Sequence, residues 1–246
     1  MTRLSRGEEE DVIRAQRCLT RLFFSCFVLV LSFRAAHAQD MPTDPWKKEI
    51  DSMLASDASN PPPQHGVLFI GSSSIRLWST LADDFPGVPV INRGFGGSRI
   101  ADSTRNADRL VAPYHPAVVI LYAGDNDIAE QRTPTQVVDD FKAFVARQRR
   151  DSPHLPIVFI SIKPSVARAS LWPKMRDANE GIRQWAKTQS RVIYIDIATR
   201  MLDANGRARP ELLLADGLHM QPAGYAIWID ALNPVLARYG FSPRRK

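Results

Sequence analysis

Five short apolar runs place the strongest limit on how this 246-residue chain folds. Each run is rich in β-branched residues and almost uninterrupted, which is typical of strands covered on both faces. The runs are Val67–Ile70, Val88–Ile91, Val118–Tyr122, Ile157–Ile162 and Val192–Ile195. Successive runs begin 21 to 39 residues apart, so each crossover has room for a helix. The spacing predicts an α/β fold with a parallel sheet of about five strands.

The segments between these runs carry helix signals. Thr133 and Pro134 suit the cap and first turn of one helix, and another is expected to begin near Pro222. A short helix is predicted over Trp46–Leu54. We therefore expect a three-layer α/β/α sandwich with a flavodoxin-like sheet. It would form one domain over residues 66–246, preceded by an N-terminal helix and linker over residues 39–65.

The N-terminal segment has the pattern of a secretory signal peptide. Arginines precede an apolar run over Leu22–Leu31, and Ala36-His37-Ala38 resembles a cleavage site. The run is about half the roughly 20 residues that a membrane-spanning helix needs. We predict that residues 1–38 are removed after Ala38, giving a secreted or periplasmic protein without stable membrane insertion. A retained amphipathic or tail-anchor segment is the alternative.

Charge and cysteine content narrow the function classes. Cys18 and Cys26 are the only cysteines, and both lie in the predicted signal peptide, so we expect no disulfide framework in the mature chain. Residues 1–38 hold six arginines and four acidic residues, leaving a net charge of +4 against +6 for the whole chain. No nucleic-acid, phosphate-loop, dinucleotide or zinc motif is present. We therefore expect no nucleic-acid partner, no metal and no organic cofactor.

The histidines divide according to their place relative to the strands. Ligands of parallel α/β sheets bind beyond the carboxyl ends of the strands. His65, His115 and His154 each precede a predicted strand and belong to the opposite edge. His219 follows the fifth strand and is the one histidine after residue 38 expected at the ligand-binding edge.

Other polar residues are expected at the same edge. A serine hydroxyl needs a base to become a nucleophile, and His219 could serve Ser73 in this way. Asp216 lies three residues before His219, close enough to fix the tautomer of its ring. The N–H groups of Ser73 and Gly97 and the side-chain amide of Asn126 could stabilise an oxyanion. The combination favours nucleophilic ester hydrolysis.

Four sequence blocks carry a family resemblance. Phe69–Ser73 is similar to the Gly-Asp-Ser block of the SGNH, or GDSL-like, hydrolases, and Asn92–Gly97 is similar to their second block. Gly124–Asp127 and Asp216–His219 match the Gly-x-Asn-Asp and Asp-x-x-His blocks, in the family's order. The arrangement most resembles the branch of platelet-activating-factor acetylhydrolase. The resemblance implies a serine esterase with Ser73, Asp216 and His219 as triad, and Ser73, Gly97 and Asn126 as oxyanion hole.

One departure from the family pattern concerns the nucleophile. Ser72 replaces the aspartate of Gly-Asp-Ser, which leaves three adjacent serines. We select Ser73, because Ser72 would point away at the strand end and Ser74 would enter the following helix. Arg99 is a substrate-binding candidate because it follows the second block. Further pocket candidates, with packing preferred for the tryptophans, are Arg76, Trp78, Arg93 and Trp172.

We thus expect an exported serine esterase that hydrolyses carboxylic esters. The chain lacks an evident lid insertion, which favours a shallow site and short acyl groups on a small ester or an acylated glycan. A lysophospholipase or thioesterase with a longer acyl preference is one alternative. A non-catalytic carbohydrate-binding protein is another. The oligomeric state is left open.

Overall fold

The computed structural model describes residues 44–242. The chain divides into two units at residues 47 and 48, and the fold described below belongs to the second unit, as far as residue 242. The predicted signal peptide, residues 1–38, lies outside the described residues. Within the described part of the chain, no helix is both long enough and apolar enough to cross a membrane.

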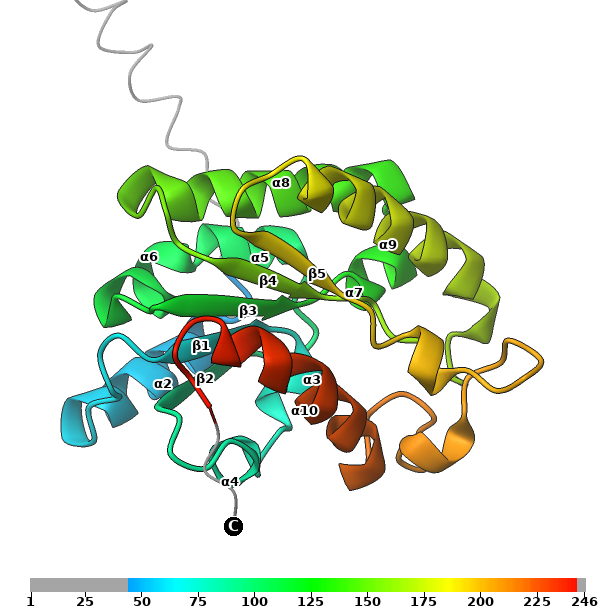
Figure 1. Cartoon of the computed structure of the whole chain (residues 1–246), viewed down its shortest axis with the longest axis horizontal. Helices are drawn as coiled ribbons and strands as arrows, with labels where there is room; N and C mark the ends of the chain where they lie inside the picture. The colour runs from blue at the N-terminus through cyan, green and yellow to red at the C-terminus, as the bar shows by residue number, and fades with distance from the viewer. Residues whose placement is uncertain (1–43, 243–246) are drawn as a thin grey trace, which may run out of the picture. The chain divides into compact units, whose positions relative to one another are not determined.

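Five parallel strands form the sheet at the centre of the fold (Figure 1). They are β1 (Val67–Gly71), β2 (Val90–Gly94), β3 (Val118–Tyr122), β4 (Ile157–Ile160) and β5 (Val192–Ile195). Their order across the sheet is β2-β1-β3-β4-β5. Val67 of β1 pairs with Val90 of β2 on one side and with Val118 of β3 on the other. The predicted α/β class and five-stranded parallel sheet are confirmed.

Helices cover both faces of this sheet. The described helices are α2 (Lys47–Ser59), α3 (Ser73–Arg76), α4 (Leu81–Asp84), α5 (Ile100–Arg105), α6 (Ala107–Leu110), α7 (Asp125–Ala129), α8 (Pro134–Asp151), α9 (Trp172–Lys187) and α10 (Pro222–Ala237). Short 3-10 turns span Ala112–Tyr114, Ala169–Leu171, Thr199–Met201 and Pro210–Leu212. Helices α5, α8 and α9 lie on one face, and α3, α4 and α10 lie on the other (Figure 1). The three-layer sandwich is therefore confirmed.

Two strand boundaries differ from the prediction. Strand β2 begins at Val90 rather than Val88, because the intervening Pro89 has no N–H to give to a ladder. Strand β4 ends at Ile160 rather than Ile162. There the side-chain amide of Asn179 binds both the N–H and the carbonyl of Ile162, at 2.7 and 2.8 Å, in place of a neighbouring strand.

Aromatic packing fixes α10 against the sheet and α3. Trp228 of α10 is fully buried, with its ring centroid 4.6 Å from that of Tyr122 on β3 and 5.8 Å from that of Trp78. Tyr225 adds a directional contact, because its hydroxyl donates to the Ser74 carbonyl of α3 at 2.9 Å. These contacts hold the start of α10, and the loop that precedes it, next to α3.

Candidate active site

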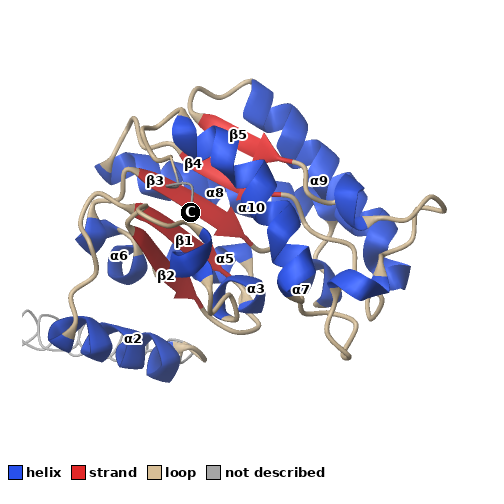
Figure 2. Ribbon diagram, turned by 60° about the horizontal axis from the view of Figure 1, so that its bottom comes forward, coloured by secondary structure: helices blue, strands red, loops and turns tan. Residues whose placement is uncertain are grey.

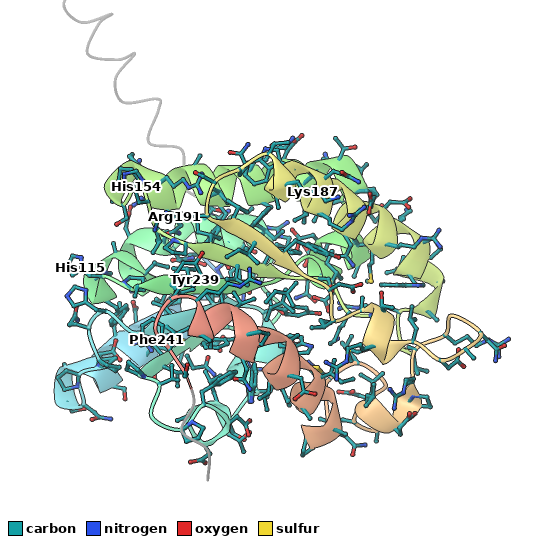
Figure 3. The ribbon with its side chains drawn as sticks, viewed as in Figure 1. His115, His154, Lys187, Arg191, Tyr239 and Phe241 are labelled. Atoms are coloured by element: carbon teal, nitrogen blue, oxygen red, sulfur yellow. The ribbon has the colours of Figure 1, made fainter. Side chains whose placement is uncertain are left out.

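The candidate site lies where the strand order reverses. Strand β1 sits between β2 and β3, so the loops after these three strands meet at the carboxyl edge of the sheet (Figure 2). His115 and His154 lie at the end where the strands begin (Figure 3). The edge rule thus separates these histidines from His219, as predicted.

A glycine turn brings Ser73 to the surface of this edge. Gly71 has a φ of +131°, and a Cβ there would lie 1.9 Å from the carbonyl oxygen of Tyr122, so only glycine fits. The Ser72 N–H then donates to the same carbonyl at 2.9 Å, and α3 starts at Ser73. Ser72 and Ser74 are 1% and 2% exposed. Ser73 is the partly accessible serine of the three.

Ser73, His219 and Asp216 form one chain of hydrogen bonds. The Ser73 Oγ lies 2.9 Å from His219 Nε2, and His219 Nδ1 lies 2.6 Å from Asp216 Oδ2. The hydrogen bond from His219, with the N–H groups of Leu218 and His219, lowers the pKa of Asp216 to about 2. An ionised Asp216 accepts a hydrogen bond from the Nδ1–H of His219 and so keeps the proton on Nδ1, which leaves Nε2 to accept the hydroxyl proton of Ser73.

The loop that carries these two residues closes on itself. We call residues 214–219 the histidine loop. The Leu214 N–H donates to the His219 carbonyl at 2.7 Å, and Leu213 bridges to Met220. Gly217 has a φ of +64°, in the left-handed region that glycine occupies without strain. The turn is therefore held by its own backbone before any contact with Ser73 is counted.

The predicted oxyanion donors come from three loops. As the first residue of α3, Ser73 has an N–H that the helix itself leaves unused. Gly97 has a φ of +73°, and nothing lies within 4 Å of the position of a Cβ there. Asn126 is 8% exposed, and its side-chain NH₂ donates to the carbonyl of Ser98, the residue after Gly97, at 3.0 Å. The structure thus brings the second and third sequence blocks together.

Arg99 has partners of its own beside this region. Its Nε lies 3.2 Å from Asp102, its Nη1 lies 3.2 Å from Glu130, and the hydrogen bond to Asp102 raises its pKa. No hydrogen bond joins Arg99 to Ser73 or Asn126. Substrate binding by Arg99 stays a prediction. Of the tryptophans, Trp78 is packed in the core, as preferred.

Arg168 contacts the candidate site, and the sequence did not single it out. It lies in the segment after β4, and its guanidinium donates to Asp125 Oδ2 and to Asn126 Oδ1, both at 3.0 Å. Its position after a strand at the carboxyl edge was the available signal. Nothing in the local sequence shows that it reaches residues more than 40 positions earlier.

Asp127 occupies the interior behind Asn126. Its side chain is fully buried, and one carboxyl oxygen accepts the N–H of Ile100 at 3.2 Å. Burial raises the pKa of Asp127 to about 7. The carboxyl group therefore ties the start of α5 to α7 from a position out of contact with solvent.

A comparison with protein families identifies the family of the chain. Residues 70–227, well over half of its length, match the GDSL-like Lipase/Acylhydrolase family. The chain belongs to this family. It is accordingly an acylhydrolase, an esterase that acts on ester substrates, as the sequence blocks implied. A comparison with curated proteins gave no match.

Solved structures share the fold of this acylhydrolase. One, named a platelet activating factor from Streptococcus pneumonia, has a TM-score of 0.69 and 21% identity over 86% of this chain and 99% of that one. A GDSL-like lipase from Bacteroides thetaiotaomicron has a TM-score of 0.67 and 19% identity, covering 77% and 97%. An acetyl xylan esterase from Geobacillus stearothermophilus has a TM-score of 0.54 and 17% identity, covering 75% and 99%.

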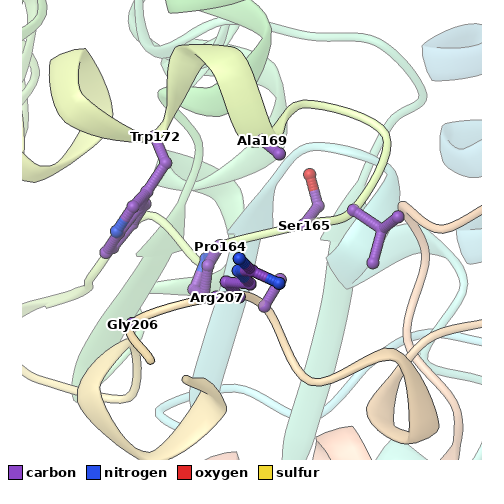
Figure 4. A pocket seen from close by; sticks show the side chains of 8 residues that line it. Pro164, Ser165, Ala169, Trp172, Gly206 and Arg207 are labelled. Carbon is purple, nitrogen blue, oxygen red and sulfur yellow. The ribbon is translucent and has the colours of Figure 1, made fainter. Parts of the chain in front are cut away.

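The acylhydrolase has a pocket of about 340 Å³ beside the segment that follows β4 (Figure 4). Its lining residues are Pro164, Ser165, Val166, Ala169, Trp172, Gly206, Arg207 and Ala208. A Cβ on Gly217 would lie 3.2 Å from Val166 Cβ, so Val166 touches both the pocket and the loop. Across residues 44–242, no three His, Cys, Asp or Glu side chains gather in a way that could hold a metal ion.

Proposed function

We propose that this acylhydrolase cleaves carboxylic esters through a covalent acyl-enzyme on Ser73. The Ser73 Oγ attacks the ester carbonyl carbon while its proton passes to His219 Nε2. The same proton then goes to the departing alcohol. In the second step, His219 Nε2 takes a proton from a water molecule while the water oxygen bonds to the acyl carbon. The bond between that carbon and Ser73 Oγ then breaks, His219 returns the proton to Ser73 Oγ, and the acid leaves. The observation that carries this proposal is the continuous hydrogen-bond chain from Ser73 Oγ through His219 to Asp216.

The tetrahedral intermediates of both steps carry an oxyanion. We assign its stabilisation to the N–H groups of Ser73 and Gly97 and to the side chain of Asn126. Asn126 supports this role because its amide NH₂ has two N–H groups and the Ser98 carbonyl takes one of them. The second remains for the substrate oxygen. Fixed donors of this kind stabilise the charge without first having to reorient.

We propose a small ester or an acylated glycan as substrate and export as the setting. The exposed site supports the substrate class, because the His219 and Asp216 side chains are 23% and 47% exposed. The fold shared with an acetyl xylan esterase is consistent with an acetylated sugar. The basic and apolar pattern of residues 1–38 supports export. Cleavage can be tested on the protein recovered from a bacterial periplasm, where we expect Gln39 to be the N-terminal residue.

A fluorophosphonate probe tests the nucleophile. We expect it to label the wild-type protein and Ser72→Ala, and to leave Ser73→Ala unlabelled. Ser72→Ala is the matched control because Ser72 is adjacent and buried. Labelling that persists in Ser73→Ala would contradict the assignment. Absence of labelling in the wild-type protein would favour the non-catalytic carbohydrate-binding alternative.

A longer acyl chain is a second candidate, with its own supporting observation. The large hydrophobic residues exposed in the described chain are Leu77, Val166 and Leu214, at 43%, 49% and 45%. The Leu77 N–H bonds to the Ser73 carbonyl, and the Leu214 N–H bonds to that of His219. Since Val166 contacts Gly217, all three flank the candidate triad. Apolar side chains so placed would favour an apolar substrate group.

Acetyl and octanoyl p-nitrophenyl esters separate the two substrate classes. With a short-acyl site, kcat/KM is highest for the acetyl ester and falls as the chain lengthens. With an apolar acyl site, kcat/KM rises by roughly fourfold for each buried methylene group. The rise would then shrink in Leu77→Ser, while Leu54→Ser on α2 would serve as the control. Turnover of the octanoyl ester alone would rule out the short-acyl proposal.

A further inference from the structure

One short loop contacts both sides of the candidate site. We call residues 163–168 the bridging loop, since they run from the end of β4 toward the site. The Ala167 N–H donates to the Gly217 carbonyl in the histidine loop at 3.1 Å. The next residue, Arg168, donates a hydrogen bond to Asn126, the proposed oxyanion donor in the segment after β3; we call this region the oxyanion side. Adjacent residues of one loop thus touch the proposed base region and the proposed oxyanion donor.

The guanidinium of Arg168 fixes the orientation of the Asn126 amide. A guanidinium carries five N–H donors and no acceptor, so the amide atom that faces it at 3.0 Å is the oxygen, Oδ1. The amide NH₂ must then face the opposite way, where it donates to the Ser98 carbonyl at 3.0 Å. The contacts with Arg168 and with Ser98 therefore both require the same orientation of the Asn126 amide.

The second arm of the guanidinium keeps it from turning. Nη1 donates to Asp125 Oδ2 at 3.0 Å, while Nη2 holds Asn126, so the planar group is anchored at two points. The Arg168 side chain is 20% exposed, which reduces the screening of its charge by water. A cationic donor on an amide oxygen draws electron density from the NH₂ and strengthens the hydrogen bonds that the NH₂ donates.

We propose that Arg168 is a positioning residue that orients and polarises the Asn126 amide for oxyanion stabilisation. The inference rests on the proposed esterase function and adds a residue to it. Arg168 acts through Asn126 and makes no contact with the reacting atoms. Its loss would leave Asn126 with the Ser98 contact alone, so the amide would spend less time with an N–H directed at the oxyanion.

The fold should tolerate removal of the guanidinium. The buried Asp125 carboxylate would keep a cationic neighbour, because Lys163 Nζ lies 3.9 Å from Asp125 Oδ2 and is 1% exposed. Burial lowers the pKa of Lys163, and the Asp125 carboxylate acts against that shift. The proposed variant is therefore Arg168→Met, which keeps the length of the side chain and removes its donors. Arg168→Lys, which keeps the charge and loses the fork, is the second variant.

A double-mutant cycle with Asn126→Ala tests the inference. On p-nitrophenyl acetate, Arg168→Met should lower kcat by roughly tenfold, less than the roughly 10²–10³-fold cost of losing an oxyanion donor outright. KM should stay within about twofold, since the interaction is made in the transition state. In the Asn126→Ala background the same change should lower kcat by less than about twofold. Arg183→Met is the matched control. The guanidinium of Arg183 pairs with the exposed Glu180, so its removal should leave kcat unchanged.

The possible outcomes distinguish a failure of the role of Arg168 from a failure of the proposed esterase mechanism. Multiplicative losses in the double mutant, or a raised KM with kcat unchanged, would overturn the role of Arg168 while leaving the Ser73 mechanism standing. Activity that survives in Ser73→Ala would overturn the mechanism itself. If Arg168→Met does not fold, the same cycle with Arg168→Lys decides, because lysine retains a charge beside Asp125. Where both variants fold, Arg168→Lys should keep part of the kcat that Arg168→Met loses.

Discussion

The Asp216 side chain is 47% exposed on the histidine loop, whereas Asp127, next to the proposed oxyanion donor Asn126, is fully buried. Asp216 accepts its hydrogen bonds from Leu218 and His219, within three residues. Asp127 accepts from Ile100, 27 positions away. The pKa of Asp216 falls to about 2, while burial raises that of Asp127 to about 7.

The comparison shows that the environment, more than the residue type, decides what a carboxylate does. Where donors converge on an open loop, the charged form is favoured and can orient a base. Where one donor meets a buried carboxyl, desolvation favours the proton and the group serves as a structural tie. The histidine loop is thus built from local contacts, whereas the region around the proposed oxyanion donor Asn126 is built from contacts between distant segments.

The largest expected effect comes from removing the charge of Asp216. In Asp216→Asn, the side-chain oxygen keeps the two backbone N–H bonds, so the NH₂ group turns toward His219 Nδ1. The ring must then hold its proton on Nε2, where it cannot accept the Ser73 proton. We expect kcat for p-nitrophenyl acetate to fall by roughly 10⁴-fold. The thermal midpoint should change little because the group is exposed. A variant that keeps a tenth of the wild-type kcat would show that the charge of Asp216 is not what orients His219.

Asn126→Ala tests the oxyanion side directly. Loss of the amide donor should lower kcat by roughly 10²–10³-fold, less than the Asp216 substitution. KM should change little, because the interaction strengthens as the oxyanion forms. Single-turnover acylation with p-nitrophenyl acetate measures the step itself. Asn106→Ala, which removes another buried side-chain amide of this side, is the control for folding defects. A rise in KM with unchanged kcat would place Asn126 outside the oxyanion site.

The contrast between local and distant contacts also explains which site residues could be predicted from the sequence. The Asp-x-x-His spacing placed Asp216 beside His219 because three residues of one turn suffice for their contact. The strand-edge rule brought Ser73 to the same region. Arg168 was not predicted, because its partner Asn126 lies 42 positions away in the sequence and only the folded sheet brings the two together. Arg99 was considered from its neighbourhood in sequence, while the structure shows its guanidinium held by two carboxylates.

Asp127 offers a pH test of the buried side. Its pKa rises from 3.8 to about 7 on folding, so the native state binds a proton that the unfolded state has released. Stability therefore falls as the pH rises from about 4 through about 7. Asp127→Asn stays neutral and keeps an oxygen for the Ile100 N–H. It should match the wild type near pH 4 and exceed it by a few kcal/mol above pH 7, at about 1.4 kcal/mol per unit of pKa shift.

Urea unfolding at pH 4, 5.5, 7 and 8 measures this divergence. Asp139→Asn is the control, because the Asp139 side chain is 60% exposed on α8 and makes a surface contact with Lys142. Its free energy of unfolding should run parallel to that of the wild type. Parallel curves for Asp127→Asn as well would show that Asp127 is ionised in the folded protein. The buried and exposed carboxylates would then differ less than the structure indicates.

Gly97→Ala should change stability less than Asp127→Asn does, and it separates a cost to the backbone from a cost to catalysis. Gly97 and Gly240 have φ values of +73° and +84°, and neither has an atom within 4 Å of a would-be Cβ. Alanine should therefore cost each position about 1–2 kcal/mol of backbone strain, with no clash. Only Gly97→Ala should also lower kcat for p-nitrophenyl acetate, because its N–H must keep its direction toward the oxyanion. Equal kcat in the two variants would mean that the Gly97 N–H is not an oxyanion donor, and would leave Ser73 and Asn126 to supply that stabilisation.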